Sequence, residues 1–251
     1  MHSLPTVVQI ANPIIVKQSP FFSILPESLI QEFAQHFHLE IWNKGDYINP
    51  NKLMTEFYFL QDGQLEIKRT NPDTGREVTL DMLEKGDSFD VMTLLDGKPH
   101  DVILSPITRL QLVSIPMEMM RRWIWTYPEL NQKFLPYLAK KMRQQEERTS
   151  SFVLHDMTTR LSRLILKHIH KIQTYAGNKE DEQKNHLMNG YSDDLLARMV
   201  GSVRQVVNKQ LQFWHSQGII NKKRNQIIIN DLDTLYKEAK ILQSEIEQNN
   251  E

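Results

Sequence analysis

The feature that most constrains the fold of this chain is a basic run near the C-terminus, from Leu195 to Asn230. It carries six Lys or Arg and no Asp or Glu, whereas the whole chain of 251 residues has a formal net charge of −1. The positive charge is therefore local. Within the run, two segments with helical spacing flank Gly201, and a hairpin-forming segment follows. This order is typical of a helix–turn–helix followed by a β-wing.

Capping residues place the two helices of this run. Ser192 is followed by two acidic residues and predicts the start of a first helix, because a Ser hydroxyl and carboxylates both suit a helix N-terminus. That helix should end near Val200-Gly201, since Gly can take the left-handed turn. Ser202 then predicts the start of a second helix that reaches about Trp214. Its expected core-facing positions are Val206, Val207, Leu211 and Trp214.

The opposite face of the second helix has side chains that suit the major groove of DNA. Arg can pair with guanine O6 and N7, and Gln with adenine N6 and N7. We expect bases to be contacted by Arg204, Gln205, Asn208 and Lys209, and phosphates by Ser202, Lys222, Lys223 and Arg224. The lack of acidic residues fits an attraction to phosphate. The run therefore predicts double-stranded DNA as a partner, and the alternative is a solvated basic face on a structural helical hairpin.

From about Leu39 to Ile115 the apolar residues alternate with a period of two, and Gly residues interrupt the alternation. Many short strands separated by Gly turns predict a β-sandwich or jelly roll of about 80 residues. Asp62-Gly63 predicts a tight hairpin within residues 57–67. With the helical segments on either side, the expected fold class is α+β.

The rest of the chain divides around this sandwich. The acidic residues 176–190 are expected to form a loop, and helical spacing covers residues 26–37, 117–124, 129–154, 156–175 and 232–247. The predicted domains are an irregular N-terminal extension (1–20), a jelly-roll sensor domain (21–128), a dimerisation helix (129–155) and a winged helix–turn–helix domain (156–251).

The long helix over residues 129–154 carries a heptad seam. Apolar or small polar residues follow the spacing 3,4,3,4,3 at Leu135, Leu138, Met142, Gln145, Thr149 and Phe152. A seam of this kind pairs helices in a coiled coil, and paired DNA-binding helices need paired subunits. We therefore expect a homodimer, with a hinge at Asp156 between the seam and the DNA-binding domain. The alternative is an ordinary amphipathic helix that packs on the sandwich.

Composition excludes several kinds of site and location. The chain has no Cys, which excludes disulfides, thiolate nucleophiles and Cys-ligated zinc or iron–sulfur centres. No apolar run approaches the ~20 residues of a membrane helix. The N-terminus lacks the basic region and long apolar core of a signal peptide. We expect a cytoplasmic protein that does not contact a membrane.

Two other classes of protein share parts of this pattern. Metal-binding cupin enzymes are jelly rolls with two His separated by one residue, a Glu beyond and a later His, an order that His36, His38, Glu40 and His100 echo loosely. The first pair comes before the strands that should present metal ligands, so we expect neither a metal site nor an enzyme. A cyclic-nucleotide module of a channel or kinase would leave the C-terminal basic run unexplained.

Several motifs resemble those of the cAMP receptor protein/FNR (Crp/Fnr) family of bacterial transcription regulators. The resemblance runs from about Phe21 over nearly the whole chain, and its motifs are residues 44–48, 57–65, 85–89 and 199–211, of which the last is the most specific. It implies a homodimer on a two-fold symmetric DNA site, with one recognition helix in each half-site. It also implies Arg204, Gln205 and Lys209 as the base contacts, and we expect RNA polymerase as a partner.

Departures from the family pattern concern both halves of the chain. Val203 stands where the family usually has Ser or Thr, which puts a contact from that position in doubt. In cAMP-binding members a Gly-Glu pair and a later Arg-Ser pair hold the ribose and the cyclic phosphate, and the matching positions here are Asp90-Val91 and His100-Asp101. A cation is lost and two carboxylates appear. Each carboxylate would repel a phosphate by roughly 1–4 kcal/mol at 4 Å.

We therefore expect no cAMP or cGMP in the usual mode and no resident cofactor. Three modes of control stay open. The sandwich could bind an unidentified effector, the protein could bind DNA constitutively, or it could answer to a protein partner.

Overall fold

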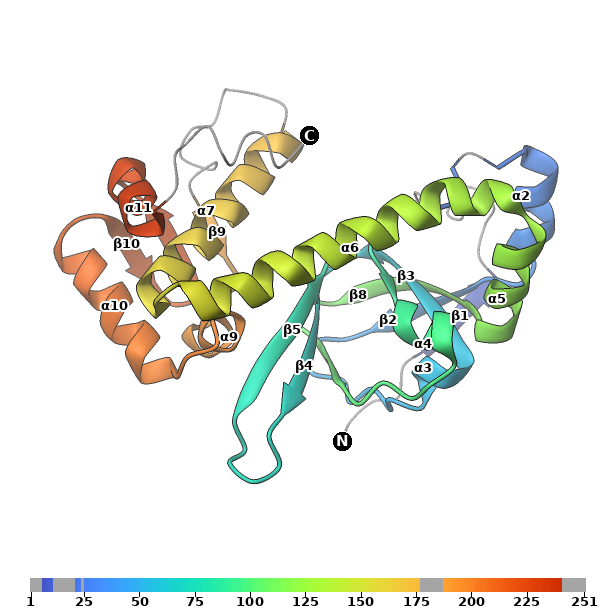
Figure 1. Cartoon of the computed structure of the whole chain (residues 1–251), viewed down its shortest axis with the longest axis horizontal. Helices are drawn as coiled ribbons and strands as arrows, with labels where there is room; N and C mark the ends of the chain where they lie inside the picture. The colour runs from blue at the N-terminus through green and yellow to red at the C-terminus, as the bar shows by residue number, and fades with distance from the viewer. Residues whose placement is uncertain (1–5, 11–20, 24, 177–186, 241–251) are drawn as a thin grey trace. The chain divides into compact units, whose positions relative to one another are not determined.

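A computed structural model of the chain describes residues 6–10, 21–23, 25–176 and 187–240. They belong to two compact units, residues 1–144 and residues 145–251. The first unit is a β-sandwich with helices, and the second is mainly helical with a small sheet (Figure 1). Across the described ranges, no helix combines the length and the apolar character needed to cross a membrane.

Two antiparallel sheets form the sandwich, as the alternating sequence predicts. The larger sheet has the order β1-β2-β8-β3-β6, built from β1 (Thr6–Ile10), β2 (His38–Trp42), β8 (Leu110–Pro116), β3 (Glu56–Asp62) and β6 (Ser88–Phe89). The smaller has the order β5-β4-β7, built from β5 (Glu77–Leu83), β4 (Leu65–Thr70) and β7 (Ile103–Pro106). Apolar side chains of both sheets, among them Trp42, Leu65 and Leu104, share one buried cluster.

Helices cover the other face of the larger sheet. They are α2 (Glu27–Ala34), α5 (Met117–Thr126) and the first turns of α6 (Pro128–Leu154). Phe33 of α2 stacks on Trp123 of α5 with ring centroids 3.6 Å apart, and Phe134 of α6 is buried in the same cluster. The beginning of α6 is therefore part of the sandwich unit, and the predicted helices near 117–124 and 129–154 are both present.

The prediction of a hairpin at Asp62-Gly63 is wrong, because the strands on either side of this turn do not pair with each other. Strand β3 pairs with β8 and β6, whereas β4 pairs with β5 and β7, so this turn carries the chain from one sheet to the other. Gly63 has a φ of 97°, and a Cβ there would lie 2.5 Å from the carbonyl oxygen of Arg109. The position needs Gly for both reasons. An Asp-Gly pair indicates a tight turn, but pairing with distant strands decides which sheet β3 and β4, on either side of the turn, each join.

Short segments also differ from the predictions. Residues 6–10 of the expected irregular extension pair with β2 as an edge strand. Lys52–Thr55 (α3) and Val91–Asp96 (α4) are helical inside the region where alternation predicted strands. Leu187–Asn189 (β9) forms a strand inside the predicted loop 176–190, while residues 177–186 lie outside the described part. Strands β1 and β9 were not predicted because each is held by a partner, β2 or β11, that lies far away in the sequence.

The second unit contains the predicted winged helix–turn–helix. Helix α7 (Met157–Ala176) follows α6 after a break of two residues, and α9 (Asp193–Met199) and α10 (Arg204–Ser216) flank the turn at Gly201. Strands β10 (Ile220–Lys223) and β11 (Gln226–Ile229) form the wing, and α11 (Leu232–Ala239) packs on α7. The predicted final helix continued to residue 247, and residues 241–247 lie outside the described part.

Candidate nucleic-acid interface

The turn between α9 and α10 is built from local hydrogen bonds. Ser192 begins α9 as predicted, since its hydroxyl accepts a bond from the Leu195 amide at 3.2 Å. Gly201 ends the helix with a φ of 64°, and the Ser202 amide donates back to the Ala197 carbonyl at 2.8 Å. These two features form a Schellman-type end. Ser202 therefore closes the first helix and does not cap the second, contrary to the prediction.

Helix α10 has a buried stripe and an exposed face. Val207, Leu211 and Trp214 are fully buried, as predicted, but Val206 is 44 % exposed, so its assignment to the core is wrong. The N-cap of α10 is Val203, whose side chain makes no capping bond. The prediction failed at Val206 because that residue lies at the border of the apolar stripe, where only the packing of the neighbouring elements decides its burial.

Three of the predicted base-contacting residues lie exposed on α10. Arg204 begins the helix, Gln205 follows it, and Lys209 lies one turn further along. Within residues 6–10, 21–23, 25–176 and 187–240, none of their side chains has a hydrogen-bond or ion-pair partner. The fold thus leaves two cations and an amide, all able to pair with base edges, directed away from the core.

The wing is a two-residue hairpin joined to a third strand. Lys223 pairs with Gln226, so Arg224 and Asn225 form the turn, and Asn225 has a positive φ of 54°, a conformation that Asn adopts more readily than most residues. Strand β11 also pairs with β9. Lys223 and Arg224 are exposed, and neither side chain is paired with a residue that the structure describes. The predicted phosphate contacts at the tip are therefore free to meet a ligand.

Lys222 has a different environment from the other two cations of the wing. Its ammonium nitrogen lies 2.7 Å from Asp193 Oδ2 and 3.1 Å from Asn208 Oδ1, and its side chain is 14 % exposed. The ion pair ties the wing to the start of α9 and to the middle of α10. Asn208, a predicted base contact, is thus engaged with Lys222 in the free chain. Sequence patterns alone missed this contact, because Asp193 also fits the role of a first-turn acid.

In the sandwich, two of the four residues at the expected effector positions, Asp90 and His100, bind each other. Asp90 is buried, and its Oδ1 accepts a bond from the Met92 amide at the start of α4. Its Oδ2 accepts a bond from the Thr93 hydroxyl at 2.9 Å and lies 2.6 Å from His100 Nδ1. Val91 is half-buried and Asp101 is exposed. The oxygens of Asp90 therefore already have partners within the chain.

Two domain families and several relatives match this chain. Residues 42–127 match the cyclic nucleotide-binding domain family, and residues 159–238 match the Crp-like helix-turn-helix domain family. A CRP-like cAMP-activated global transcriptional regulator of Mycobacterium tuberculosis is 25% identical over 183 residues, which are 73% of this chain and 79% of the relative. The global nitrogen regulator of Synechococcus elongatus is 28% identical over 158 residues, 61% of this chain and 68% of the relative.

A solved structure also shares the fold. The c-di-GMP responsive global regulator CLP of Xanthomonas campestris superimposes with a TM-score of 0.63 at 20% identity, covering 81% of this chain and 99% of its own. The chain belongs to the Crp/Fnr family. It is a DNA-binding transcription regulator that acts as a homodimer on a two-fold symmetric site. The expected α+β fold, with a cyclic-nucleotide-binding-like jelly roll and a C-terminal helix–turn–helix, is confirmed.

The dimer helix of this Crp/Fnr regulator presents the predicted seam unevenly. Leu135 and Met142 are 59% and 65% exposed, and Gln145 and Thr149 are also exposed. Leu138 is half-buried. Exposed apolar side chains on a helix suit a surface that a second copy covers, so these positions stay predicted seam residues.

Phe152, the last predicted seam residue, packs on the helix–turn–helix. A Cβ built on Gly201 would lie only 2.6 Å from Phe152 Cε1. The guanidinium carbons of Arg148 and Arg160 lie 5.8 and 5.4 Å from its ring centroid. These two Arg side chains also donate bonds to the last carbonyls of α9, at 3.3 and 2.9 Å. The end of α6 is thereby fixed to the turn, and the sequence alone had no signal for the two Arg contacts.

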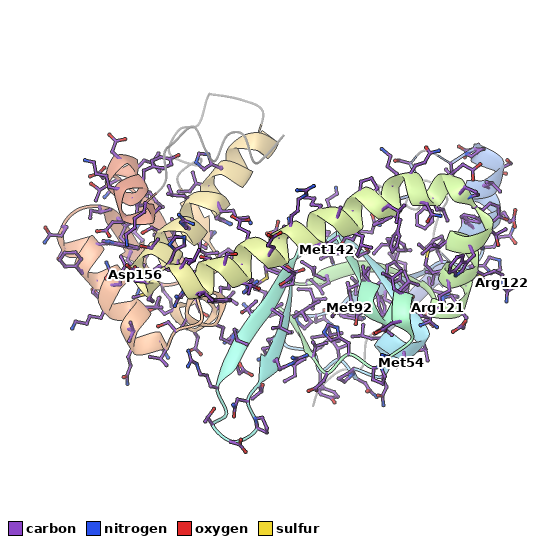
Figure 2. The ribbon with its side chains drawn as sticks, in the orientation of Figure 1. Met54, Met92, Arg121, Arg122, Met142 and Asp156 are labelled. Carbon is purple, nitrogen blue, oxygen red and sulfur yellow. The ribbon has the colours of Figure 1, made fainter. Side chains whose placement is uncertain are left out.

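Asp156, the predicted hinge, lies between α6 and α7 (Figure 2). Its Oδ1 accepts a bond from the Thr159 amide at 2.8 Å, and its Oδ2 lies 3.1 Å from Lys240 Nζ. The bond from the Thr159 amide, with the Lys240 ammonium, lowers the pKa of Asp156 to about 2. The residue thus caps α7 and links it to the end of α11, at a place where two helices meet.

Side chains on α5 and α6 also hold the effector region of the sandwich. Arg121 Nε donates to the Leu94 carbonyl at the end of α4 at 2.8 Å (Figure 2). Lys141 Nζ lies 3.1 Å from Asp81 Oδ2 and 3.0 Å from Asp87 Oδ1. Burial lowers the pKa of Lys141, but the two carboxylates outweigh it and raise the pKa above its ordinary value. The ion pairs of Lys141 with Asp81 and Asp87 therefore hold α6 against the sandwich.

The residues of the cupin-like order are engaged elsewhere. Glu40 is buried and accepts bonds from Trp42 Nε1 and Lys52 Nζ, both at 3.0 Å, while His100 contacts Asp90. Over the described ranges, no group of three or more His, Asp or Glu side chains is placed to hold a metal ion. The named relatives are transcription regulators, so the enzyme alternative is not favoured.

Proposed function

We propose that this regulator contacts bases with Arg204, Gln205 and Lys209, and phosphates with Ser202, Lys223 and Arg224. The observation that carries the proposal is that these three α10 side chains are exposed and have no hydrogen-bond or ion-pair partner among the described residues. Lys223 and Arg224 at the wing tip are exposed and have no partner among the described residues, so they add phosphate attraction.

Asn208 and Lys222 belong to the same proposed surface, but they act in a second step. The Lys222 ammonium holds Asp193 and Asn208 in the free chain. A phosphate could replace Asp193 as its partner at little cost, because one oxyanion exchanges for another. Movement of the Lys222 ammonium toward the phosphate would also break its bond with Asn208 and release that side chain toward a base. The two residues would thus contact DNA only after this exchange.

Enrichment from a pool of random duplexes tests the assignment, and a two-fold symmetric sequence is the expected product. Arg204→Ala should cost roughly 1–3 kcal/mol on the enriched site and relax the preference at one position. Lys223→Ala is the matched control, since loss of a phosphate contact should weaken specific and random duplexes alike. Equal losses on both kinds of duplex for Arg204→Ala would rule it out as a base contact.

We propose that cAMP and cGMP do not bind the sandwich in the family's usual mode. The nucleotide would meet the carboxylates of Asp90 and Asp101, each of which repels a phosphate by roughly 1–4 kcal/mol at 4 Å. His100, at the position of the family's Arg, is already directed to Asp90. Calorimetry should detect no cAMP binding at micromolar concentrations, and micromolar affinity would refute the proposal. An effector of other chemistry remains compatible with the fold.

If an effector binds, we propose that it acts by a population shift. It would bind where α6 lies on the sandwich, alter the pairing of the seam residues Leu135 to Phe152, and so change the angle at Asp156. The recognition helices would then reach groove spacing. Met142→Glu should dissociate the dimer in analytical ultracentrifugation and reduce DNA binding.

We also propose that this regulator binds RNA polymerase and that it is located in the cytoplasm. A regulator on promoter DNA acts through the polymerase, and the acidic segment 176–190 is a candidate contact, although most of it lies outside the described residues. Pull-down of purified polymerase with the full chain on its DNA site tests this partner, and a chain with that segment replaced by Gly and Ser is the control.

A further inference from the structure

The recognition helix has an apolar edge that the proposed polar contacts leave unexplained. Val203 and Val206 are 49% and 44% exposed, although Val is a residue type that folded proteins usually bury. Their neighbour Val207 is fully buried, so the helix has an apolar side chain where its core needs one. The two exposed Val side chains are therefore extra to the packing of α10.

Neither side chain supports the helix that carries it. Val203 occupies the N-cap and makes no capping bond, whereas Ser, Thr, Asp or Asn there would bind a free amide of the first turn. Val206 is β-branched, which restricts its rotamers in a helix, and at an exposed position little packing offsets that restriction. Both residues thus destabilise the free protein slightly, which points to a role in contact with a ligand.

Their position joins them to the proposed base-contacting surface. An α-helix advances about 100° per residue, so Val206 lies about 60° from both Val203 and Lys209 around the axis. The three side chains form one row with a spacing of three residues along the exposed side. Gln205 lies one residue before Val206, on the same first turn. A helix that places Gln205 and Lys209 against base edges therefore brings this apolar row to the same groove.

We propose that Val206, with Val203 beside it, contacts the 5-methyl group of a thymine in each half-site. This methyl is the one apolar group that the base pairs present in the major groove, and apolar side chains recognise it. The inference rests on the proposed assignment of α10 as the base-contacting helix. It adds a specific preference, a T·A pair with its thymine facing this row, that hydrogen-bonding residues alone would not impose.

Deoxyuridine substitution tests the proposal, because deoxyuridine differs from thymidine only by the missing methyl and keeps every hydrogen-bonding group. After the site has been enriched, each thymine of a half-site is replaced in turn. The wild-type protein should bind about fourfold more weakly at one or two of these positions, the usual effect of one methylene-sized apolar contact. Val206→Ala and Val203→Ala should each lose part or all of this sensitivity.

Phe213→Ala is the matched control, since Phe213 is similarly exposed, at 51 %, but lies about two turns further along α10. It should keep the wild-type sensitivity. Wild-type protein that binds every deoxyuridine duplex as tightly as the thymidine duplex would overturn the inference, as would an enriched half-site without thymine. These outcomes leave specific binding intact, whereas failure to enrich any symmetric site would remove the proposed base contacts and this inference together. The wild-type series decides alone if a variant does not fold.

Discussion

The turn at Gly201 offers the sharpest test of how this DNA-binding domain is built. Two separate demands meet at that position. Its φ of 64° is left-handed, which costs an L-residue about 1–2 kcal/mol. A Cβ would also lie 2.6 Å from Phe152 Cε1, and that ring lies near the guanidinium groups of Arg148 and Arg160. Forcing such a contact typically costs about 1–3 kcal/mol. Gly201→Ala should therefore cost roughly 2–5 kcal/mol.

Gly218 provides the control for the backbone part. It has a φ of 75°, and a Cβ there would meet nothing within 4 Å, so Gly218→Ala should cost only about 1–2 kcal/mol. Urea unfolding, followed by hydrogen exchange of α9 and α10 peptides, measures the loss of stability that each of the two Gly substitutions causes. The steric part should disappear in a Phe152→Leu background, where Gly201→Ala should cost no more than Gly218→Ala does.

A different result would refute the reasoning. Equal costs for the two Gly substitutions in the wild-type background would mean that the Phe152 ring moves aside freely. The contact between α6 and the helix–turn–helix would then be too soft to transmit a change in the dimer helix. A large cost that persists with Phe152→Leu would place the strain in the backbone alone.

Three further predictions concern charged groups. Asp193→Asn should release Lys222, so the slope of log affinity against log salt concentration should steepen by up to about one unit, and an unchanged slope would contradict the exchange. Burial raises the pKa of Glu56, so its contribution to stability is present at low pH and is lost as the pH rises through that pKa. Glu56→Gln should therefore raise the melting temperature at pH 7 but not at pH 4. Asp156 has a lowered pKa of about 2, so its capping contribution is present at neutral pH and is lost as the pH falls toward 2. Asp156→Ala should cost about 1 kcal/mol at pH 7, with the difference from wild type closing in acid.

The local parts of the fold follow well from the sequence. Ser192 and Gly201 delimit α9 because their capping roles depend on neighbours only a few residues away. The break near Asp156 is local for the same reason. The Asp62-Gly63 turn shows the limit, because its geometry is local, whereas the sheet that β4 joins depends on β5 and β7.

The predicted site divides in the same way. The types of side chain that could contact DNA, Arg204, Gln205 and Lys209, follow from residue chemistry and helical spacing. The state of Lys222 does not, since its partner Asp193 lies 29 residues away and meets it only because the wing folds against α9. The apolar stripe likewise predicted Val206 to be buried, and only the arrangement of neighbouring elements leaves it exposed.

The sequence by itself determined a sandwich, a dimer helix and a basic helix–turn–helix with a wing, since periodicity, capping and charge act over short distances. The tertiary structure alone decided that Asp90 and His100 bind each other and that Phe152 and two Arg side chains hold the turn. It also decided that Lys222 is paired, while Lys223 and Arg224 have no partner among the described residues. Each of these contacts joins residues from separate elements, and their energies depend on distances that only the packed chain sets.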